Sequence, residues 1–255
     1  MKITPIPLLS GRSDNYGYLI HDPRTGEAAV VDPVEPEKVL AVVKTENAKV
    51  VGILTTHHHG DHAGGNAEFV QKVPNIKVWG GDDRIEAITT KVTDNKPFKI
   101  GSLEVTPLYT ICHTTGSVSY YVVDPETNEK AVFTGDTLFI GGCGRFFEGT
   151  ADQMHNSLIN ILGRLPPDTK VYCGHEYTKS NLKFAQSVDP SSSAIQSKLA
   201  WAEKTEITVP STIAGEFTFN PFMRVGEEVM RKATGKEDEV EVMAKLRELK
   251  NNFKG

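Results

Sequence analysis

The sequence contains Thr56-His57-His58-His59-Gly60-Asp61-His62 directly after the apolar run Val50–Leu54, which is typical of a buried β-strand. Four of the chain's eight histidines fall within these few residues. Side chains of an extended segment alternate between two sides, so we expect His57 and His59 to point into one space and His58 to point elsewhere. The end of this strand therefore presents two imidazoles to a common space.

Gly60 permits a sharp turn, after which we expect Asp61 and His62 to open a helix that begins near Ala63. A carboxylate and a further imidazole then face the same space from another direction. A histidine run can also be a tag or a solvated loop, but this run is internal, follows an apolar strand and includes an aspartate. Imidazole and carboxylate ligands suit zinc, iron or manganese, whereas calcium does not require this many histidines. The stretch predicts a metal site.

Three further segments place polar residues at or just beyond the end of an apolar run. Together with the first loop they supply five histidines and two aspartates, enough for two metal ions with one aspartate bridging. Two ions ~3.5–4 Å apart can hold a hydroxide between them and polarise a carbonyl at the same time. Taken singly, the added residues would be hydrogen-bonded core or turn residues, and only their conjunction indicates ligands. The segments are Cys112-His113-Thr114-Thr115-Gly116, Thr134-Gly135-Asp136-Thr137 and Cys173-Gly174-His175-Glu176-Tyr177.

The remaining histidines and the cysteines have simpler interpretations. His21, His58 and His155 are expected to be structural. The three cysteines form an odd set without a CxxC spacing, which argues against a disulfide framework and for a reducing, cytoplasmic compartment. We expect them to be small buried hydrophobic residues, although two of them lie beside presumed ligands. They are Cys112, Cys143 and Cys173.

Composition excludes several classes of protein. The 255 residues include 28 Lys and Arg against 33 Asp and Glu, so the net charge of −5 has the wrong sign for binding many nucleic-acid phosphates. No stretch approaches the ~20 apolar residues of a membrane span. Pro5 and Pro7 interrupt the N-terminal apolar residues, so this segment reads as a first strand and not as a signal peptide. We expect a monomer that binds neither nucleic acid nor membranes.

The chain is expected to have two regions. Residues 1–178 form a metal-binding domain, and residues 179–255 form a mainly helical region. Strands and helices do not alternate regularly in the first region, so two sheets with helices outside fit better than a doubly wound sheet. Strands are expected at 16–21, 28–32, 50–55, 77–80, 103–108, 118–124, 130–134 and 170–173, and helices at 35–43, 63–73, 152–162, 181–188, 195–204 and 237–254.

The loop Thr56–His62 resembles the THxHxDH motif of the metallo-β-lactamase superfamily. That motif does not select a substrate, but three other segments resemble glyoxalase II, the hydroxyacylglutathione hydrolase family, and the similarity covers nearly the whole chain. The resemblance implies a metallo-β-lactamase fold, an αββα sandwich of two mixed sheets with a helical C-terminal region, and it implies that this region, residues 179–255, binds substrate. The three segments are Gly142–Thr150, Tyr172–Thr178 and Asn220–Arg224.

The resemblance also implies site residues. It places His57, His59 and His113 on one divalent metal ion. It places Asp61, His62 and His175 on a second ion, with Asp136 bridging, and it assigns Asp61 and Asp136 to catalysis. Zinc is the first expectation for both ions, with iron and manganese as alternatives. Contacts to glutathione are implied at Arg145, Phe146, Phe147, His175, Tyr177, Arg247 and Lys250.

Three positions depart from the family pattern. Gly60 stands where an aromatic residue is common, Phe147 where many relatives have tyrosine, and Ser117 where a histidine is frequent. None of the three is an expected ligand, so altered substrate affinity is expected and not lost chemistry. From spacing alone, Arg247 and Lys250 would be read as an exposed helical face.

The activity implied is hydrolysis of S-(2-hydroxyacyl)glutathione, chiefly S-D-lactoylglutathione, to glutathione and D-lactate, a step of methylglyoxal detoxification. One alternative is a persulfide dioxygenase with a single iron, whose relatives lack the full second ligand set and the long C-terminal region. A β-lactamase or lactonase would share the histidine loop but not the segments around Arg145 and Tyr177. A non-catalytic protein braced by metal is another alternative, but structural zinc usually prefers closed, cysteine-rich sites.

Overall fold

The computed structural model describes residues 1–254 and divides into two compact units. Unit 1 comprises Met1–Tyr109 and Gly116–Gly135, and unit 2 comprises Thr110–Thr115 and Asp136–Gly255. Among the described residues, no helix has the length and apolar character needed to cross a membrane.

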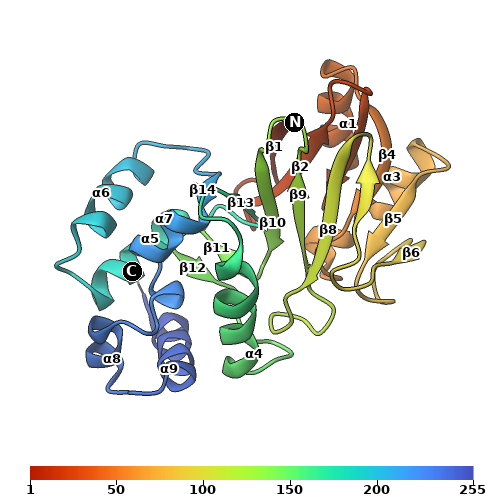
Figure 1. Cartoon of the computed structure of the whole chain (residues 1–255). Coiled ribbons are helices and arrows are strands. Elements are labelled where there is room, and N and C mark those ends of the chain that lie inside the picture. Colours follow the sequence, from red (N-terminus) through yellow and green to blue (C-terminus); the bar gives the residue numbers. More distant parts are fainter. Residues whose placement is uncertain (255) are drawn as a thin grey trace. The chain divides into compact units, whose positions relative to one another are not determined.

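The first sheet of unit 1 is mixed (Figure 1). Its first three strands pair antiparallel, and the strands that follow pair parallel in chain order. Apolar runs such as Ala28–Val31 and Ile53–Leu54 are buried because both faces of the sheet are covered. The strands are β1 (Lys2–Leu8), β2 (Asn15–His21), β3 (Glu27–Val31), β4 (Lys49–Leu54), β5 (Lys77–Gly80) and β6 (Thr90–Lys91).

Helices cover one face of this sheet. Helix α1 (Pro36–Thr45) begins with proline in its first turn, where no intrahelical N–H is required, and helix α3 (Asn66–Lys72) follows the one-turn helix α2 (Gly60–Ala63). Val39 of α1 and Phe69 of α3 are fully buried in one apolar cluster with residues of β2 to β5. None of the residues expected to bind metal belongs to this core, so the core forms through the packing of apolar side chains and not through metal binding.

The second group of strands in unit 1 is antiparallel, in the order β10-β9-β8-β7. It packs against the first sheet: the rings of Tyr18 and Phe133 lie 5.2 Å apart between centroids, and those of Trp79 and Phe98 lie 4.7 Å apart. Unit 1 therefore has the layers helix, sheet, sheet. The strands are β7 (Phe98–Ile100), β8 (Leu103–Tyr109), β9 (Val118–Val123) and β10 (Lys130–Gly135).

Unit 2 is mainly helical. It contains a small hairpin of β11 (Leu138–Phe139) and β12 (Gly142–Cys143), and a second antiparallel pair of β13 (Lys170–Cys173) and β14 (Ser211–Thr212). Helix α4 (Ala151–His155) continues as a π-helical turn over Asn156–Ile161. The remaining helices are α5 (Thr178–Val188), α6 (Ser193–Ala202), α7 (Ile213–Phe219), α8 (Glu228–Thr234) and α9 (Glu239–Asn252), with 3₁₀ turns at Leu162–Arg164 and Pro221–Met223.

The expected helix over residues 63–73 is wrong in its outline. The chain forms α2 and α3 with a break at Gly64 and Gly65. A Cβ atom on Gly65 would lie 2.2 Å from the carbonyl oxygen of Pro33, so two backbone segments approach each other here as only glycine allows. Glycines inside a periodic pattern thus mark the end of one helix and the start of another.

Candidate metal centre

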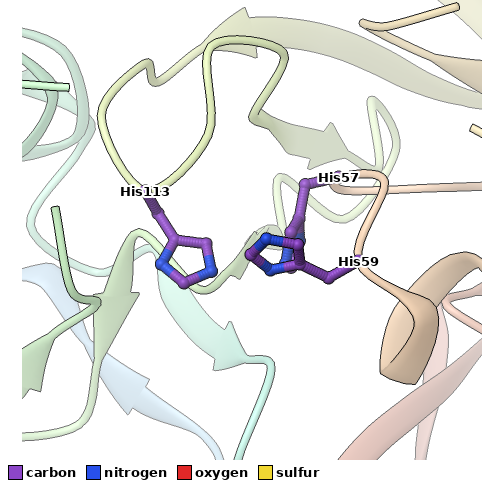
Figure 2. A group of neighbouring side chains, drawn as sticks. All are labelled: His57, His59 and His113. Atoms are coloured by element: carbon purple, nitrogen blue, oxygen red, sulfur yellow. The ribbon is translucent and has the colours of Figure 1, made fainter. Parts of the chain in front are cut away.

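The predicted ligands divide between the two units. In unit 1, the loop after β4 carries His57 and His59, whose Nε2 and Nδ1 atoms lie 3.1 Å apart (Figure 2). Thr56 Oγ1 lies 3.0 Å from His57 Nδ1, which leaves His57 Nε2 as the atom facing His59. The prediction that these two side chains point into one space is confirmed. Figure 2 also draws His113, on the loop after β8.

Asp61 and His62 lie inside the short helix α2, which begins at Gly60 and not near Ala63 as expected. The helix begins there because the carbonyl of His59 accepts hydrogen bonds from the N–H groups of both His62 and Ala63, at 2.9 and 2.8 Å. Asp61 Oδ2 lies 3.8 Å from His62 Nε2. The carboxylate and the imidazole are therefore neighbours on one turn, as the sequence predicted.

Asp32, directly after β3, contacts an expected ligand and was missed by sequence reasoning. Its carboxylate accepts hydrogen bonds from the backbone N–H of Thr56 at 2.8 Å and from the Thr56 hydroxyl at 2.6 Å, and it pairs with His62 Nδ1 at 2.8 Å. A carboxylate partner on one ring nitrogen fixes the tautomer, so His62 Nε2 keeps its lone pair for a metal. The signal available was an aspartate at the end of a buried apolar run, the place that other expected ligands also occupy.

Asn15 is a second residue that was missed. Its side-chain amide donates to the carbonyl oxygen of Asp61 at 2.9 Å and to Asp61 Oδ2 at 3.2 Å. These bonds hold both the backbone and the carboxylate of Asp61. Nothing in the local sequence distinguishes Asn15 from an ordinary turn residue, so only the fold could identify it.

In unit 2, three predicted ligands lie together. Asp136 Oδ2 lies 3.5 Å from His113 Nε2 and 3.2 Å from His175 Nε2. The carbonyl of Arg145 lies 3.0 Å from His113 Nδ1 and can only accept, so Nδ1 carries the proton and Nε2 has the lone pair. A single carboxylate oxygen between two imidazole nitrogens is the arrangement that a bridging ligand requires.

The cysteines beside these ligands are buried, as expected. Cys112 Sγ donates to the carbonyl of Thr150 at 3.2 Å, and Cys173 Sγ donates to that of His175 at 3.3 Å. Burial raises the pKa of each thiol to about 12, Cys143 included. Thiols that stay protonated at neutral pH are poor metal ligands and poor nucleophiles, so these residues pack the site.

Two aromatic side chains lie beside the unit 2 ligands. The Tyr177 ring stacks on His175 with the centroids 4.6 Å apart and the planes 7° apart. The Phe147 ring lies 5.2 Å from that of His113, yet Phe147 is 61% exposed. An exposed aromatic face beside a polar centre is suited to contact a bound molecule.

Arg247 and Lys250 do not form an exposed helical face, so the interpretation from spacing alone is wrong. Arg247 is buried and donates from Nη1 to the carbonyl of Cys143 at 2.9 Å, and Lys250 Nζ donates to the carbonyl of Ser180 at 3.0 Å. Burial, and then the charge of Arg247, lower the pKa of Lys250 to about 8. These two cations are held in place by the fold and suit an anionic ligand.

Comparison with known proteins agrees with this geometry. The family model "Metallo-beta-lactamase superfamily" matches residues 11–175, and "Hydroxyacylglutathione hydrolase C-terminus" matches residues 176–253. The structure is similar to ETHE1 from Myxococcus xanthus, with a TM-score of 0.71 and 26% identity over 96% of this chain and 90% of that one. It is also similar to the BLEG-1 B3 metallo-β-lactamase, with a TM-score of 0.62 and 25% identity over 87% and 99%.

Curated relatives match over the whole length. A cytoplasmic hydroxyacylglutathione hydrolase of Arabidopsis thaliana is 48% identical over 100% of both chains. A probable hydroxyacylglutathione hydrolase of Schizosaccharomyces pombe is 46% identical over 98% of both. The chain thus belongs to the metallo-β-lactamase superfamily and, within it, to the hydroxyacylglutathione hydrolase family. The fold class predicted from the sequence is confirmed.

Proposed function

We propose that this enzyme hydrolyses S-(2-hydroxyacyl)glutathione thioesters, chiefly S-D-lactoylglutathione, to glutathione and D-lactate. The position of Asp136 Oδ2 between His113 Nε2 and His175 Nε2 carries the proposal, because a shared carboxylate oxygen suits two adjacent cations. Full-length relatives named hydroxyacylglutathione hydrolase support the choice of substrate.

We propose two divalent ions per chain. As the family resemblance implies, His57, His59 and His113 would bind one ion, Asp61, His62 and His175 would bind the other, and Asp136 would be shared by both. The donors present are imidazole nitrogens and carboxylate oxygens, which fit zinc first and also iron or manganese. Asp32 and the Arg145 carbonyl support this assignment, because each holds one ring nitrogen of a ligand so that the other keeps its lone pair.

The bound ions supply Lewis acidity, which makes water a nucleophile near neutral pH and polarises a carbonyl oxygen. Asp61 and Asp136 provide the negative charge that holds the cations. Asp32 and Asn15 keep His62 and Asp61 in one orientation, so little reorganisation is needed when charge develops. The thiolate of glutathione leaves with a reference pKa of ~8.5, so the site needs no strong general acid.

The substrate contacts are also part of this proposal. Tyr177 and Phe147 present aromatic faces beside His175 and His113. Arg145, Phe146 and His175 complete the contacts near the reacting end, and Arg247 and Lys250 attract the glutathione carboxylates. Because Arg247 and Lys250 touch a remote part of the substrate, replacing both by alanine should raise KM more than it lowers kcat. The loss in kcat that does occur should come from the Cys143 carbonyl, which Arg247 no longer holds.

The test is loss of thioester absorbance of S-D-lactoylglutathione with purified protein, beside metal analysis and an Asp136→Ala control. Rapid hydrolysis with about two metals per chain, lost in the control, is the expected result. No hydrolysis despite two bound metals would move the assignment to another thiol carrier or ester. A single iron with oxygen uptake on glutathione persulfide would indicate a dioxygenase.

A cytoplasmic location is proposed as well, supported by the name of the Arabidopsis relative. The monomeric state remains a prediction from the sequence. Light scattering behind a size-exclusion column measures the mass in solution and decides it.

A further inference from the structure

The hairpin of β11 and β12 connects Asp136 to Arg145 within unit 2. Its turn residue Gly141 has a positive φ of 69°, and the strand residues Leu138, Phe139 and Cys143 are buried. Because water is excluded here, the backbone polar groups of the turn need protein partners. Four buried side chains from the C-terminal region supply them.

Each of these partners binds a particular group of the hairpin. Asn181 of α5 donates to the carbonyl of Ile140 at 3.2 Å, and Arg247 of α9 donates to that of Cys143 at 2.9 Å. Asn220 donates to the carbonyls of Phe139 and Gly142 at 3.2 and 3.0 Å. The N–H of Gly141 donates to Glu216 Oε2 at 2.9 Å. The C-terminal region therefore holds both strands and the turn between them.

Glu216 of α7 has a special place in this network because it holds Asn220 as well. Glu216 Oε2 accepts from the Asn220 amide at 2.9 Å, and Oε1 accepts from the hydroxyl of Ser211. A carboxylate can only accept from the amide, so it fixes the NH₂ group of Asn220 toward the hairpin carbonyls. Without Glu216, the Gly141 N–H would be buried without its partner and Asn220 could rotate.

Stability alone does not account for a carboxylate at this place. Glu216 is fully buried, and burial raises its pKa to about 7. The positive charge of Lys198 partly offsets this rise in the pKa of Glu216. The Nζ atom of Lys198 lies 3.7 Å from the ring centroid of Trp201. An apolar side chain of similar size could fill this buried place, but only a group that accepts hydrogen bonds from Gly141 and Asn220 fixes their geometry.

The ends of the hairpin are coupled to the unit 2 ligands. The Gly144 N–H donates to the carbonyl of Thr137 at 3.2 Å. A Cβ atom on Gly144 would lie 1.9 Å from the carbonyl oxygen of Asp136, so the two backbones are in direct contact. The next residue, Arg145, accepts the hydrogen bond of His113. A shift of the hairpin therefore moves both Asp136 and the group that orients His113.

We propose that Glu216 is a positioning residue for hydrolysis: through Gly141 and Asn220 it fixes the β11–β12 hairpin and so sets the positions of Asp136 and Arg145. This role rests on the proposed function. Glu216 touches neither the ligands nor the substrate contacts in its own hydrogen bonds. Its effect on the reaction passes through the hairpin alone.

The test compares four variants with the unsubstituted holoenzyme. Glu216→Ala removes all three hydrogen bonds. Glu216→Gln keeps them, because its Oε1 accepts from Gly141 and Asn220 while its amide donates to Ser211. Ser211→Ala removes only the bond to the other carboxylate oxygen. Ile195→Ala, a fully buried position of α6, is a control that lowers stability through a cavity and removes none of the side-chain hydrogen bonds to the hairpin.

Hydrogen exchange of residues 138–143, kcat, KM and melting temperature are measured for each. In Glu216→Ala, the amide hydrogens of residues 138–143 should exchange faster with solvent, and kcat/KM should fall about 10- to 100-fold. A small misplacement of catalytic groups lowers the rate by a factor of this size. Glu216→Gln and Ser211→Ala should have nearly the same exchange rates and the same kcat/KM as the unsubstituted enzyme. Ile195→Ala should melt earlier with unchanged exchange in the hairpin and unchanged kcat.

Unchanged hydrogen exchange and kinetics in Glu216→Ala overturn the proposal. A loss of kcat/KM in Glu216→Gln or Ile195→Ala as large as that in Glu216→Ala overturns it as well. Where Glu216→Ala does not fold, Asn220→Ala gives the same readouts, since it removes the contacts to Phe139 and Gly142 and leaves the carboxylate. Absence of hydrolysis in the unsubstituted protein refutes the proposed function instead. The exchange comparison then decides separately whether Glu216 fixes the hairpin.

Discussion

Asp32 and His62 form a pair in which each residue depends on the other. The carboxylate accepts two hydrogen bonds from Thr56 and pairs with His62 Nδ1 at 2.8 Å. Replacing Asp32 by alanine should lower metal affinity by about 10- to 100-fold, because the imidazole loses its fixed tautomer and orientation. Competition with a metal-binding dye measures this affinity.

Asp22→Ala is the matched control for Asp32→Ala. Asp22 is also a buried carboxylate at a strand end in unit 1, but it accepts from Ser102 and Thr25 and has no contact with an expected ligand. Its substitution should leave metal affinity unchanged. An equal loss in both variants would mean that Asp32 acts through the stability of the sheet and not through His62.

Lys250 gives a pH dependence whose sign follows from its environment. Burial, and then Arg247, lower the pKa of Lys250 to about 8, so the side chain is protonated below this pH and neutral above it. In the proposed substrate contact, only the protonated form of Lys250 attracts a carboxylate, and KM should therefore rise as the pH increases through about 8. KM measured from pH 6.5 to 9.5 tests the prediction.

In Lys250→Met the rise of KM above pH 8 should disappear, and KM should be high throughout. Lys245→Met is the control on the same helix, since Lys245 pairs at the surface with Glu248 at 2.9 Å. A pH profile that is the same in Lys250→Met and in the unsubstituted enzyme would show that another group controls binding.

Among single residues, the sequence revealed those whose side chains have a distinctive chemistry, such as metal binding by imidazole. Histidines and aspartates after apolar strands could be recognised because strand ends gather at a site and imidazoles favour transition metals. Asn15 and Asp32 could not be ranked, because their function lies in contacts to Asp61 and His62 that only the fold creates. Glu216 carries no local signal at all.

Elements with clear periodicity were predicted well. The strands β5 and β13 have the expected bounds, and β2, β3, β4, β8, β9 and β10 differ from them by a residue or so at their ends. The strands β6, β7, β11, β12 and β14 were not predicted, because two or three residues are too few to show alternation. Backbone pairing with a neighbouring strand, and not a side-chain pattern, defines such short strands.

The start of helix α4 supports the loop that carries His113. The Thr150 hydroxyl accepts from the Gln153 N–H, the Gln153 side chain accepts from the Thr150 N–H, and Cys112 Sγ donates to the Thr150 carbonyl. Thr150→Ala removes the capping hydroxyl and should lower the free energy of unfolding by about 1 kcal/mol. Urea denaturation followed by circular dichroism measures the change.

Thr150→Ser keeps the hydroxyl and should retain nearly all of that stability. Because the backbone carbonyl that holds Cys112 remains in both variants, kcat should hardly change in either. A large loss of activity in Thr150→Ala would mean that the cap also determines where His113 lies.

For the whole molecule, metal binding and folding should be separable. The apolar core of unit 1 contains no expected ligand, so the chain does not need ions to bury its hydrophobic residues. Removing the ions with a chelator should abolish hydrolysis and lower the melting temperature while the far-ultraviolet circular dichroism stays native. Returning zinc at 100 times its dissociation constant should restore about 2.7 kcal/mol of stability.

Lowering the pH should release metal ions from the protein, as a chelator does. Protons and metal ions would compete for the same imidazole nitrogens of the proposed ligands His57, His59, His62, His113 and His175, so metal content after dialysis should fall as the pH is lowered. The same chelator saturated with zinc beforehand is the control and should change nothing. A metal-free chain that loses its secondary structure would contradict the prediction, because the ions would then brace the fold as in a closed structural site. Such a result would favour the non-catalytic alternative, whereas a folded and inactive apoprotein that regains hydrolysis with zinc leaves catalysis as the role of the ions.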